Sequence, residues 1–368
     1  PYNENVYIHK AVILSKTKRH QEAIQFLTKG LKYCDSKAEF HSMLAMEYLF
    51  LDSYTMAKEH FIKCIDENPK DTNALYNIIY CFESLEQPDG AIQFLNGYLE
   101  ADPFNEIAWH QLGRQYVSKD LLKQALSSYD FAIICDNEFI GAYFEMGKTL
   151  KKMKRYNEAI LAFETTLSID DPTAFALLHI GLCHFELGNT ELAIQYFKRT
   201  LNEDPLYDKA WIALIDAYRD NKDYEKALYY AKKSIQIDNV NAITWKKYAE
   251  INFKLGFFEE ANLGFQECVN LGNYEVDTWV TWADVLKEMH DYPRAIEVLQ
   301  HGLEFHLESS VINFRLGGIY LLSSQSLEAR FYLKNAYMAD EKQLNHFFET
   351  FPQFKSSSFV KQSLSLKV

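Results

Sequence analysis

Glycine and proline are scarce in this chain of 368 residues, with 14 and 8 copies, which argues against a turn-rich all-β fold. No run of 18 apolar residues occurs, so the sequence predicts no membrane-spanning helix and no membrane partner. Positive charge is also in deficit, because the formal net charge is −13. A chain of this charge is disfavoured as a binder of nucleic acid, and the balance points instead to protein or peptide partners.

Clustered cysteines are missing as well. The six cysteines are spread along the chain and form no CxxC pair, which argues against both a disulfide framework and a zinc site. They fit small buried hydrophobic residues in a reducing compartment, so we expect a cytoplasmic location. These cysteines are Cys34, Cys64, Cys81, Cys135, Cys183 and Cys268.

The chain does contain a repeat of 34 residues. An alanine recurs at every step, and no insertion or deletion interrupts the register between Glu4 and Gln343. Four residues beyond each alanine lies a large apolar residue, with Ala231 as the one exception. A period between 20 and 50 residues is typical of repeat architectures. The alanines are Ala23, Ala57, Ala91, Ala125, Ala159, Ala193, Ala227, Ala261, Ala295 and Ala329.

Within each repeat the apolar spacing is helical. In the sixth repeat, Leu177, Ile180 and His184 fall on one stripe of a helix, and a second stripe begins at Ala193. The turn signal at Gly188 separates the two stripes, so each repeat is predicted to be helix A, a short turn and helix B. A small residue on helix B lets helix A approach closely, which explains the alanine column.

These columns carry a resemblance to the tetratricopeptide repeat family, whose period is 34 residues. The fourth repeat comes close to the full family pattern with Trp109, Leu112, Gly113, Tyr116, Ala125 and Tyr129. The resemblance covers about nine-tenths of the chain and implies an all-α fold, a right-handed superhelical solenoid of helical hairpins. The ten predicted repeats are 4–37, 38–71, 72–105, 106–139, 140–173, 174–207, 208–241, 242–275, 276–309 and 310–343.

Both ends of the array depart from the pattern. Residues 1–3 fall in the column that closes a hairpin, so we expect them to be the end of a truncated upstream repeat. Residues 344–368 are expected to hold one or two capping helices and a tail, with a first helix from Leu344 stopped by Pro352 and a last one ending at Leu364. The alternative is that this tail docks into a groove of its own chain or of a neighbour.

The sequence contains no convincing motif for nucleotide binding, metal binding or catalysis. The segment from Gly141 to Thr149 has five residues between its glycines, where a phosphate loop needs four, and it lies within a predicted helix. His179 and Cys183 are four residues apart but lack the further ligands of a structural zinc site. No three consecutive repeats carry the lysine and asparagine set of the family's carboxylate clamp. We therefore expect no catalytic residue, no metal and no cofactor, and the chain is predicted not to be an enzyme.

The resemblance implies that the A helices form the concave wall of the solenoid. Several inward positions of the third to sixth repeats are aromatic, and apolar or aromatic surface residues that cluster tend to mark an interaction surface. Positive residues on the same face alternate with Glu83, Glu145, Asp216 and Glu250, which suits an extended polypeptide. The predicted binding residues are Tyr76, Asn77, Tyr80, His110, Arg114, Phe144, Lys148, Phe175, His179, Phe185, Arg219 and Lys247.

The sequence thus predicts a non-catalytic scaffold or adaptor that binds a peptide or a partner protein along its concave groove. One alternative is the regulatory array of a larger enzyme whose catalytic domain lies outside this chain. Another is a structural module that self-associates through the ends of the array or the C-terminal tail. An RNA-binding helical repeat fits the period of 34 but not the net charge of −13.

Overall fold

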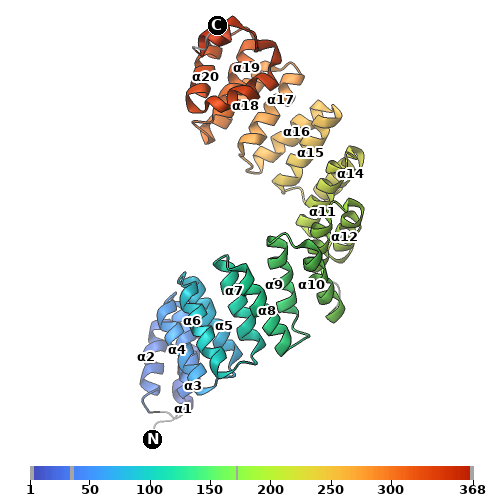
Figure 1. The fold of residues 1–368 in the computed structure, drawn as a ribbon. Helices are drawn as coiled ribbons and strands as arrows, with labels where there is room; N and C mark the ends of the chain where they lie inside the picture. The colour runs from blue at the N-terminus through green and yellow to red at the C-terminus, as the bar shows by residue number, and fades with distance from the viewer. Residues whose placement is uncertain (1–3, 34–36, 171–172, 365–368) are drawn as a thin grey trace. The chain divides into compact units, whose positions relative to one another are not determined.

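The described residues, 4–33, 37–170 and 173–364 of the computed structural model, form 22 α-helices, two short 3-10 helices and no strand (Figure 1). The predicted all-α fold is confirmed. Contacts divide the chain into two compact units, unit 1 (Pro1–Pro172) and unit 2 (Thr173–Val368). The expected end of an upstream repeat, residues 1–3, lies outside the described residues.

Unit 1 is a stack of five helical hairpins. Each odd-numbered A helix packs against the B helix that follows it, and the B helices α2, α4, α6 and α8 each pack against the next A helix. The A helices α5, α7 and α9 also contact one another in order, so one face of the stack consists of A helices. The bounds are α1 Glu4–Lys16, α2 His20–Gly30, α3 Lys37–Phe50, α4 Tyr54–Glu67, α5 Thr72–Ser84, α6 Pro88–Ala101, α7 Glu106–Ser118, α8 Leu122–Cys135, α9 Ile140–Lys152 and α10 Tyr156–Ile169.

Unit 2 continues with five more hairpins built in the same way. Its A helices α11, α13, α15, α17 and α19 contact one another in sequence. The bounds are α11 Ala174–Glu186, α12 Thr190–Glu203, α13 Asp208–Asp220, α14 Tyr224–Ile237, α15 Ala242–Leu255, α16 Phe258–Asn270, α17 Val276–Glu288, α18 Tyr292–Phe305, α19 Ser310–Leu322 and α20 Ser326–Ala339.

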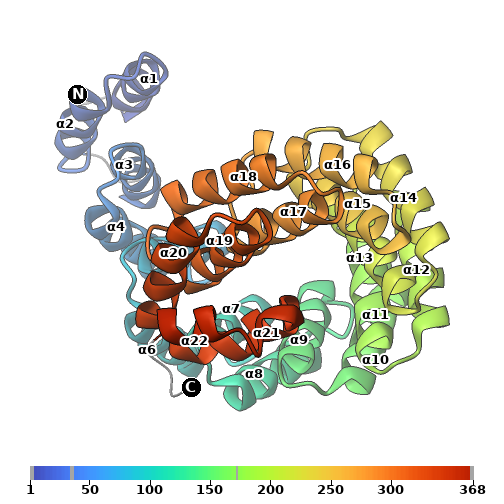
Figure 2. The ribbon, with the colours of Figure 1, turned by 90° about the horizontal axis from the view of Figure 1, so that it is seen from above.

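The C-terminal segment folds back on the last hairpin of unit 2. Helix α21 (Leu344–Thr350) contacts α19, and α22 (Ser358–Ser363) contacts α20 (Figure 2). Short 3-10 helices at Glu341–Gln343 and Pro352–Phe354 precede and follow α21. The side chains of Phe347, Phe351 and Val360 are buried in the same apolar cluster as α19 and α20. The segment thus covers apolar surface that the last hairpin would otherwise expose.

The alanine column sets the spacing of the two helices in a hairpin. All ten alanines have 0% relative exposure. The facing position on helix A is small for the same reason, as at Gly147, where an added Cβ would lie 2.7 Å from Cε1 of the fully buried Phe163 ring. Burying such a ring stabilises the fold by about 2–3 kcal/mol. In the seventh repeat the sizes are exchanged, because Ile215 occupies the small position of helix A and Ala231 the large position of helix B.

The turn between helix A and helix B repeats its backbone geometry. In each repeat the residue five before the column alanine has a positive φ, and the next residue donates its N–H to the carbonyl five residues earlier, as Gln87 does to Phe82. This is the Schellman ending of a helix. Glycine fills this position only at Gly188 and Gly256; the others are Lys18, Asp52, Glu86, Asp120, Lys154, Lys222, His290 and Ser324.

The start of several A helices is fixed by a capping side chain. Asp71 and Asn105 accept hydrogen bonds from the backbone N–H groups of Ala74 and Ala108, at 3.0 and 2.9 Å. Each bond satisfies a donor that the first helical turn would leave unpaired, and such a cap stabilises a helix by about 1 kcal/mol. The caps fix where each A helix begins, and so which side chains it places on the A-helix face.

Candidate functional site

The residues predicted to bind a partner fall in both units, so each set is described within its own unit. In unit 1, Tyr76 and Tyr80 are exposed on α5, where the ring of Tyr80 meets that of Tyr54 edge-on at 6.1 Å. Asn77 is half-buried, and its amide donates to the carbonyl of Asn73. The rings of Tyr76 and Tyr80 thus lie at the surface of the A-helix face of unit 1.

The charged residues of this face in unit 1 are engaged with neighbours. Arg114 on α7 forms an ion pair of 3.5 Å with Glu83 on α5. Lys148 on α9 pairs with Glu145 at 2.8 Å, and its ammonium group lies 5.6 Å from the centre of the Phe144 ring. A ligand at this face would meet ion pairs and rings together.

His110 takes a different place from its neighbours in the predicted set. Both ring nitrogens are buried without a hydrogen-bond partner, and the ring packs against Tyr129 and Phe139. Burial lowers the pKa of His110 to about 4. The imidazole is therefore neutral at physiological pH and belongs to the packing between α7, α8 and α9.

In unit 2 the first predicted residues are aromatic. Phe175 is exposed at the start of α11, and its ring stacks on Tyr207 at 6.1 Å. The ring of His179 lies one helical turn further on, 5.3 Å from that of Phe175. Phe185 is half-buried against the apolar core of the unit. The first A helix of unit 2 thus carries a small cluster of rings, formed by Phe175 and His179 with Tyr207.

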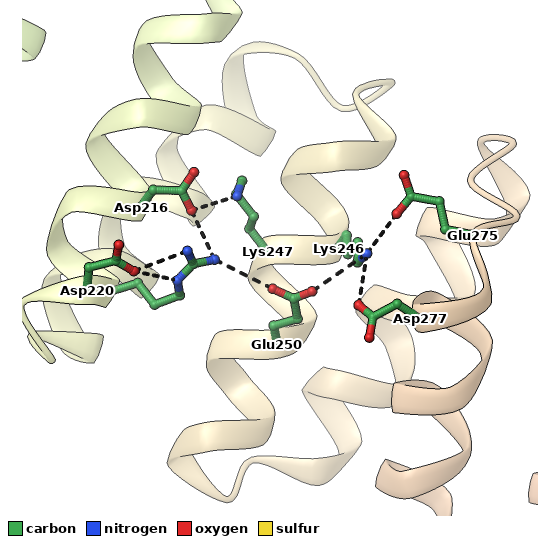
Figure 3. Close-up of polar contacts among 8 residues, drawn as sticks. Asp216, Asp220, Lys246, Lys247, Glu250, Glu275 and Asp277 are labelled. Carbon is green, nitrogen blue, oxygen red and sulfur yellow. Dashed lines mark hydrogen bonds and ion pairs between the residues drawn. The ribbon is translucent and has the colours of Figure 1, made fainter. Parts of the chain in front are cut away.

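The remaining predicted residues, Arg219 and Lys247, belong to an ion network on three successive A helices (Figure 3). Lys247 on α15 donates to Asp216 on α13 at 2.6 Å. Arg219 lies 3.0 Å from Asp216, 3.2 Å from Asp220 and 3.8 Å from Glu250. The network runs through Asp216, Arg219, Asp220, Lys246, Lys247, Glu250, Glu275 and Asp277.

Lys246 is the second node of this ion network. Its ammonium group lies 4.0 Å from Glu250 on its own helix, 2.8 Å from Glu275 and 3.1 Å from Asp277 at the start of α17 (Figure 3). Its side chain is 15% exposed, whereas those of Glu275 and Asp277 are 65% and 70% exposed. The cation is thus covered, and the carboxylates around it face solvent.

The electrostatics of the network follow from its burial. Burial raises the pKa of Glu250, against the attraction of Lys246, Lys247 and Arg219. Burial also acts to lower the pKa of Lys246, but its hydrogen bonds to Glu275 and Asp277 outweigh that effect and raise it. The hydrogen bond from Lys246 lowers the pKa of Glu275. The lysine therefore keeps its charge well above neutral pH.

A cleft of about 660 Å³ lies beside the network on the A-helix face of unit 2. We call it the polar cleft. Its walls combine charged and aromatic side chains, so a ligand in it can make both ion pairs and ring contacts. The lining includes Arg219, Tyr224, Glu250, Phe253, Asp277, Thr281 and Asp284.

Asp284 closes one wall of the polar cleft through a nearly buried ion pair. Its Oδ2 atom lies 2.9 Å from Arg315 on α19, and Arg315 is 8% exposed. Its Oδ1 atom is buried and accepts no hydrogen bond, with the ammonium group of Lys287 at 3.8 Å. Burial raises the pKa of Asp284, against the attraction of Arg315. One buried carboxylate oxygen in this wall thus has unused accepting capacity.

Sequence reasoning missed Tyr224, Thr281 and Asp284 as lining residues, and it missed the pairing of the charges. A signal was present. Ion pairs between neighbouring A helices repeatedly join residues 31 apart, which is one repeat less one helical turn. A search of the sequence for opposite charges 31 residues apart would therefore have found these ion pairs. The pairs are Glu83–Arg114, Asp216–Lys247, Arg219–Glu250, Lys246–Asp277 and Asp284–Arg315.

The other groups considered for chemistry lie in the packing. The segment from Gly141 to Thr149 is within α9, and His184 stacks on Tyr196. Burial raises the pKa of Cys64 and Cys81 to about 11, so these thiols are poor nucleophiles at neutral pH. Within residues 4–33, 37–170 and 173–364, no three metal-binding side chains come together, and no helix is long and apolar enough to cross a membrane.

The repeat has counterparts in known proteins. Sequence profiles of the tetratricopeptide repeat match residues 4–36, 52–116, 140–172, 175–206 and 193–242. The TPR repeat-containing protein YpiA of Bacillus subtilis is 22% identical over 294 residues, which cover 79% of this chain and 68% of YpiA. The TPR repeat-containing protein MJ1428 of Methanocaldococcus jannaschii is 21% identical over 322 residues, which cover 80% of this chain but only 56% of MJ1428.

Among solved structures, yeast Tom70 aligns over 99% of both chains with 13% identity and a TM-score of 0.49. The repeat of 34 residues, the ten buried alanines and the matching profiles agree on one family. The chain belongs to the tetratricopeptide repeat family.

Proposed function

We propose that this chain is a non-catalytic scaffold that holds a peptide or an extended segment of a partner protein along its A-helix face, with the polar cleft of unit 2 as the main binding site. The observation that carries the proposal is the cleft itself, which places ion pairs from three successive A helices next to Tyr224 and Phe253. A ligand there would exchange water for charged and aromatic contacts, which suits a polypeptide better than a uniformly charged polymer.

The family supports this function in its coarser form, since tetratricopeptide repeats are typically protein-interaction scaffolds. The cytoplasm is the proposed location, because the described cysteines form no disulfide and Cys64, Cys81 and Cys268 are buried.

The test is a blocking substitution that leaves the hairpin packing intact. Thr281→Trp fills the polar cleft from a half-buried position, and Ser127→Trp places the same side chain on the exposed surface of α8 as the control. Peptides selected against the wild-type chain from a displayed library of random sequences are measured by fluorescence anisotropy. We expect Thr281→Trp to weaken binding at least about tenfold, because the indole ring takes the space that the ligand would fill and so removes its central contacts, and Ser127→Trp to leave binding unchanged. Selected peptides that bind Thr281→Trp as tightly as wild type would refute the cleft as the site.

A second function, self-association, has support from the outer face of α20. Leu327, Phe331 and Met338 lie on one stripe of this helix and are 81%, 59% and 75% exposed. In the other nine repeats the column of Leu327 holds polar residues or proline: Gln21, Thr55, Asp89, Lys123, Asn157, Glu191, Glu225, Glu259 and Pro293. Leu327 thus adds an exposed apolar residue in a column that is otherwise polar or proline, and with Phe331 and Met338 it forms a stripe that fits burial against a second copy of the chain.

Sedimentation at several concentrations tests this second function. The wild-type chain should form a dimer that Phe331→Glu disrupts, because a buried charge opposes the contact. A wild-type chain that stays monomeric at every concentration would exclude it.

A further inference from the structure

The third hairpin, formed by α5 and α6, departs from the pattern of side-chain sizes that sets the helix spacing elsewhere. Ile79 occupies the position of helix A that is alanine or glycine in eight other repeats. Ile215 is large at the same position but faces the small Ala231, whereas Ile79 faces the large Leu95. Ile79 and Leu95 are both buried, and α5 and α6 approach each other closely over less of their length than the helices of any other hairpin. Two large side chains at one contact thus hold this hairpin open.

A groove of about 840 Å³ lies along this open hairpin, between the successive B helices α4 and α6. We call it the outer groove. Three of its lining residues form a row of rings, in which Phe82 and Tyr98 are buried and Phe94 is half-buried. The ring of Phe94 lies 6.2 Å from that of Phe82 and 6.4 Å from that of Tyr98. The outer groove therefore offers an aromatic surface on which apolar side chains can pack.

Helix α6 borders the outer groove with small side chains. Gly90, Gln93, Gly97 and Ala101 fall on one stripe of α6, and all four line the groove. A Cβ atom at Gly97 would meet no atom within 4 Å. A ligand can therefore approach the backbone of α6 closely along about 16 Å, or three helical turns. The other nine repeats carry larger residues in the column of Gly97: Lys29, Lys63, Phe131, Thr165, Arg199, Lys233, Glu267, His301 and Asn335.

The backbone of a ligand determines which secondary structure fits the outer groove. Helices α4 and α6 pair their own backbone groups, so the groove presents no sheet edge to a ligand. The hydroxyl group of Tyr98 is also engaged, because it donates to the carbonyl of Pro69. An extended segment would leave most of its N–H and C=O groups without partners here, whereas an α-helix pairs them internally. The ligand that fits is therefore an α-helix of about three turns with an apolar face.

One end of the outer groove is acidic. Asp66 and Asp102 line it near the C-terminal ends of α4 and α6, where the last carbonyl groups add partial negative charge. Residues 62–71 and 97–106, which surround this end, hold six carboxylates and two lysines. At the opposite end, Lys58 donates to Gln87, the residue before α6, and lies 4.2 Å from the centre of the Phe82 ring. A helix in the groove is therefore stabilised by basic residues at its end beside Asp66 and Asp102.

We propose that the outer groove binds an amphipathic α-helix of a partner protein, which packs its apolar face on the row of rings and places basic residues beside Asp66 and Asp102. The groove belongs to unit 1, and the polar cleft belongs to unit 2. This inference thus adds a second binding site and does not depend on the proposed function of the cleft.

The test selects helical peptides from a displayed library against the wild-type chain. The library is an alanine and glutamine helix as long as α6, 14 residues, with random residues at both ends and at four positions spaced i, i+3, i+4 and i+7. We expect the selected peptides to carry apolar residues at the four positions and lysine or arginine at one end. Binding of each selected peptide, labelled with fluorescein, is then measured by fluorescence anisotropy.

A blocking variant assigns the binding to the outer groove. Gly97→Gln places a long uncharged side chain in the groove, and its Cβ enters open space, so the hairpin packing is kept. Ser127→Gln adds the same side chain to the exposed surface of α8 as the control. We expect Gly97→Gln to weaken binding at least about tenfold, because the ligand loses its close approach to α6, and Ser127→Gln to leave binding unchanged. Circular dichroism confirms that each variant is folded.

A matched pair of double variants tests the basic end. Each selected peptide is compared with an analogue whose basic residues are glutamine, and the analogue should bind about threefold to tenfold more weakly at low salt. Asp66→Asn with Asp102→Asn should abolish this difference. Glu138→Gln with Glu164→Gln removes two exposed carboxylates elsewhere in unit 1 and should preserve it.

Several results would overturn the proposal. A library that yields no binder, or binders that Gly97→Gln leaves intact, would reject the outer groove. Analogues without basic residues that bind as tightly as the selected peptides would reject the acidic end as a determinant. Peptides blocked by Thr281→Trp would belong to the polar cleft instead, so the two sites are tested separately. A wild-type oligomer in sedimentation that Gly97→Gln dissociates would make a second copy of the chain the occupant in place of a partner protein.

Discussion

Lowering the pH from about 7.5 to about 5 is expected to destabilise unit 1, because two of its histidines are held neutral by burial. The ring of His60 shares a hydrogen bond of 2.8 Å with His41 and stacks on Tyr48. His110 has no hydrogen bond to either ring nitrogen. Burial lowers the pKa of both His60 and His110 to about 4.

The sign and size of the effect follow from these values. The pKa in the folded chain lies below the ordinary histidine value of 6.5, so each group contributes stability that is fully present above about pH 6.5 and is lost as the pH falls toward 4. At about pH 5, each of the two groups has lost about 2 kcal/mol. Together they remove about 4 kcal/mol, a large part of the stability of an ordinary domain.

Urea unfolding followed by circular dichroism at the two pH values measures this loss. His110→Leu keeps an apolar side chain in the site and removes the titrating group, so it should lose about 2 kcal/mol less than wild type between the two pH values. His9→Gln, a change at an exposed histidine of the same unit, is the control and should match wild type.

Two results would refute this reasoning. One is an equal loss of stability in His110→Leu and wild type. The other is an NMR titration in which the ring of His110 protonates near pH 6.5, since a ring that gains a proton so easily is not held neutral by burial.

Two further predictions concern packing. Gly147→Ala should destabilise the chain by about 1–3 kcal/mol, because the new Cβ would lie 2.7 Å from the buried Phe163 ring, whereas Gly97→Ala on α6 should stabilise it by about 0.5–1 kcal/mol, because a Cβ there meets open space. Urea unfolding must give the two changes opposite signs. Asp284→Leu should cost about 3–5 kcal/mol by leaving the Arg315 charge buried without its partner, and the double change Asp284→Leu with Arg315→Met should recover most of that loss in a double-mutant cycle.

The helix pairing could be predicted from the sequence because one column controls it. A small side chain at a fixed step is what two closely packed helices need, and the buried column alanines confirm the prediction. The exception at Ala231 has a physical explanation. Ile215 fills from helix A the space that a large residue fills from helix B elsewhere, and both residues are fully buried. In this repeat the large side chain thus comes from helix A, and the small one from helix B.

The candidate site could be predicted only in part. The repeat register places Arg219 and Lys247 on A helices, but the partners of these cations depend on how neighbouring helices are staggered, which no single repeat contains. His110 shows a second limit. Its position is exposed in an isolated A helix, but the ring of Phe139 from the next junction lies against it. The exposure of a residue on the A-helix face thus depends on side chains of the following repeat, and the pattern of columns within one repeat does not contain that information.

The type of residue at the positive-φ position of each turn affects the stability of that hairpin. A side chain in this conformation costs about 1 kcal/mol relative to glycine, and in this array only Gly188 and Gly256 avoid that cost. The stability of a repeat array is close to a sum over its hairpins and their interfaces. Evolution or design can therefore lower or raise the stability of a chosen hairpin at its turn, and so decide where along the array opening begins.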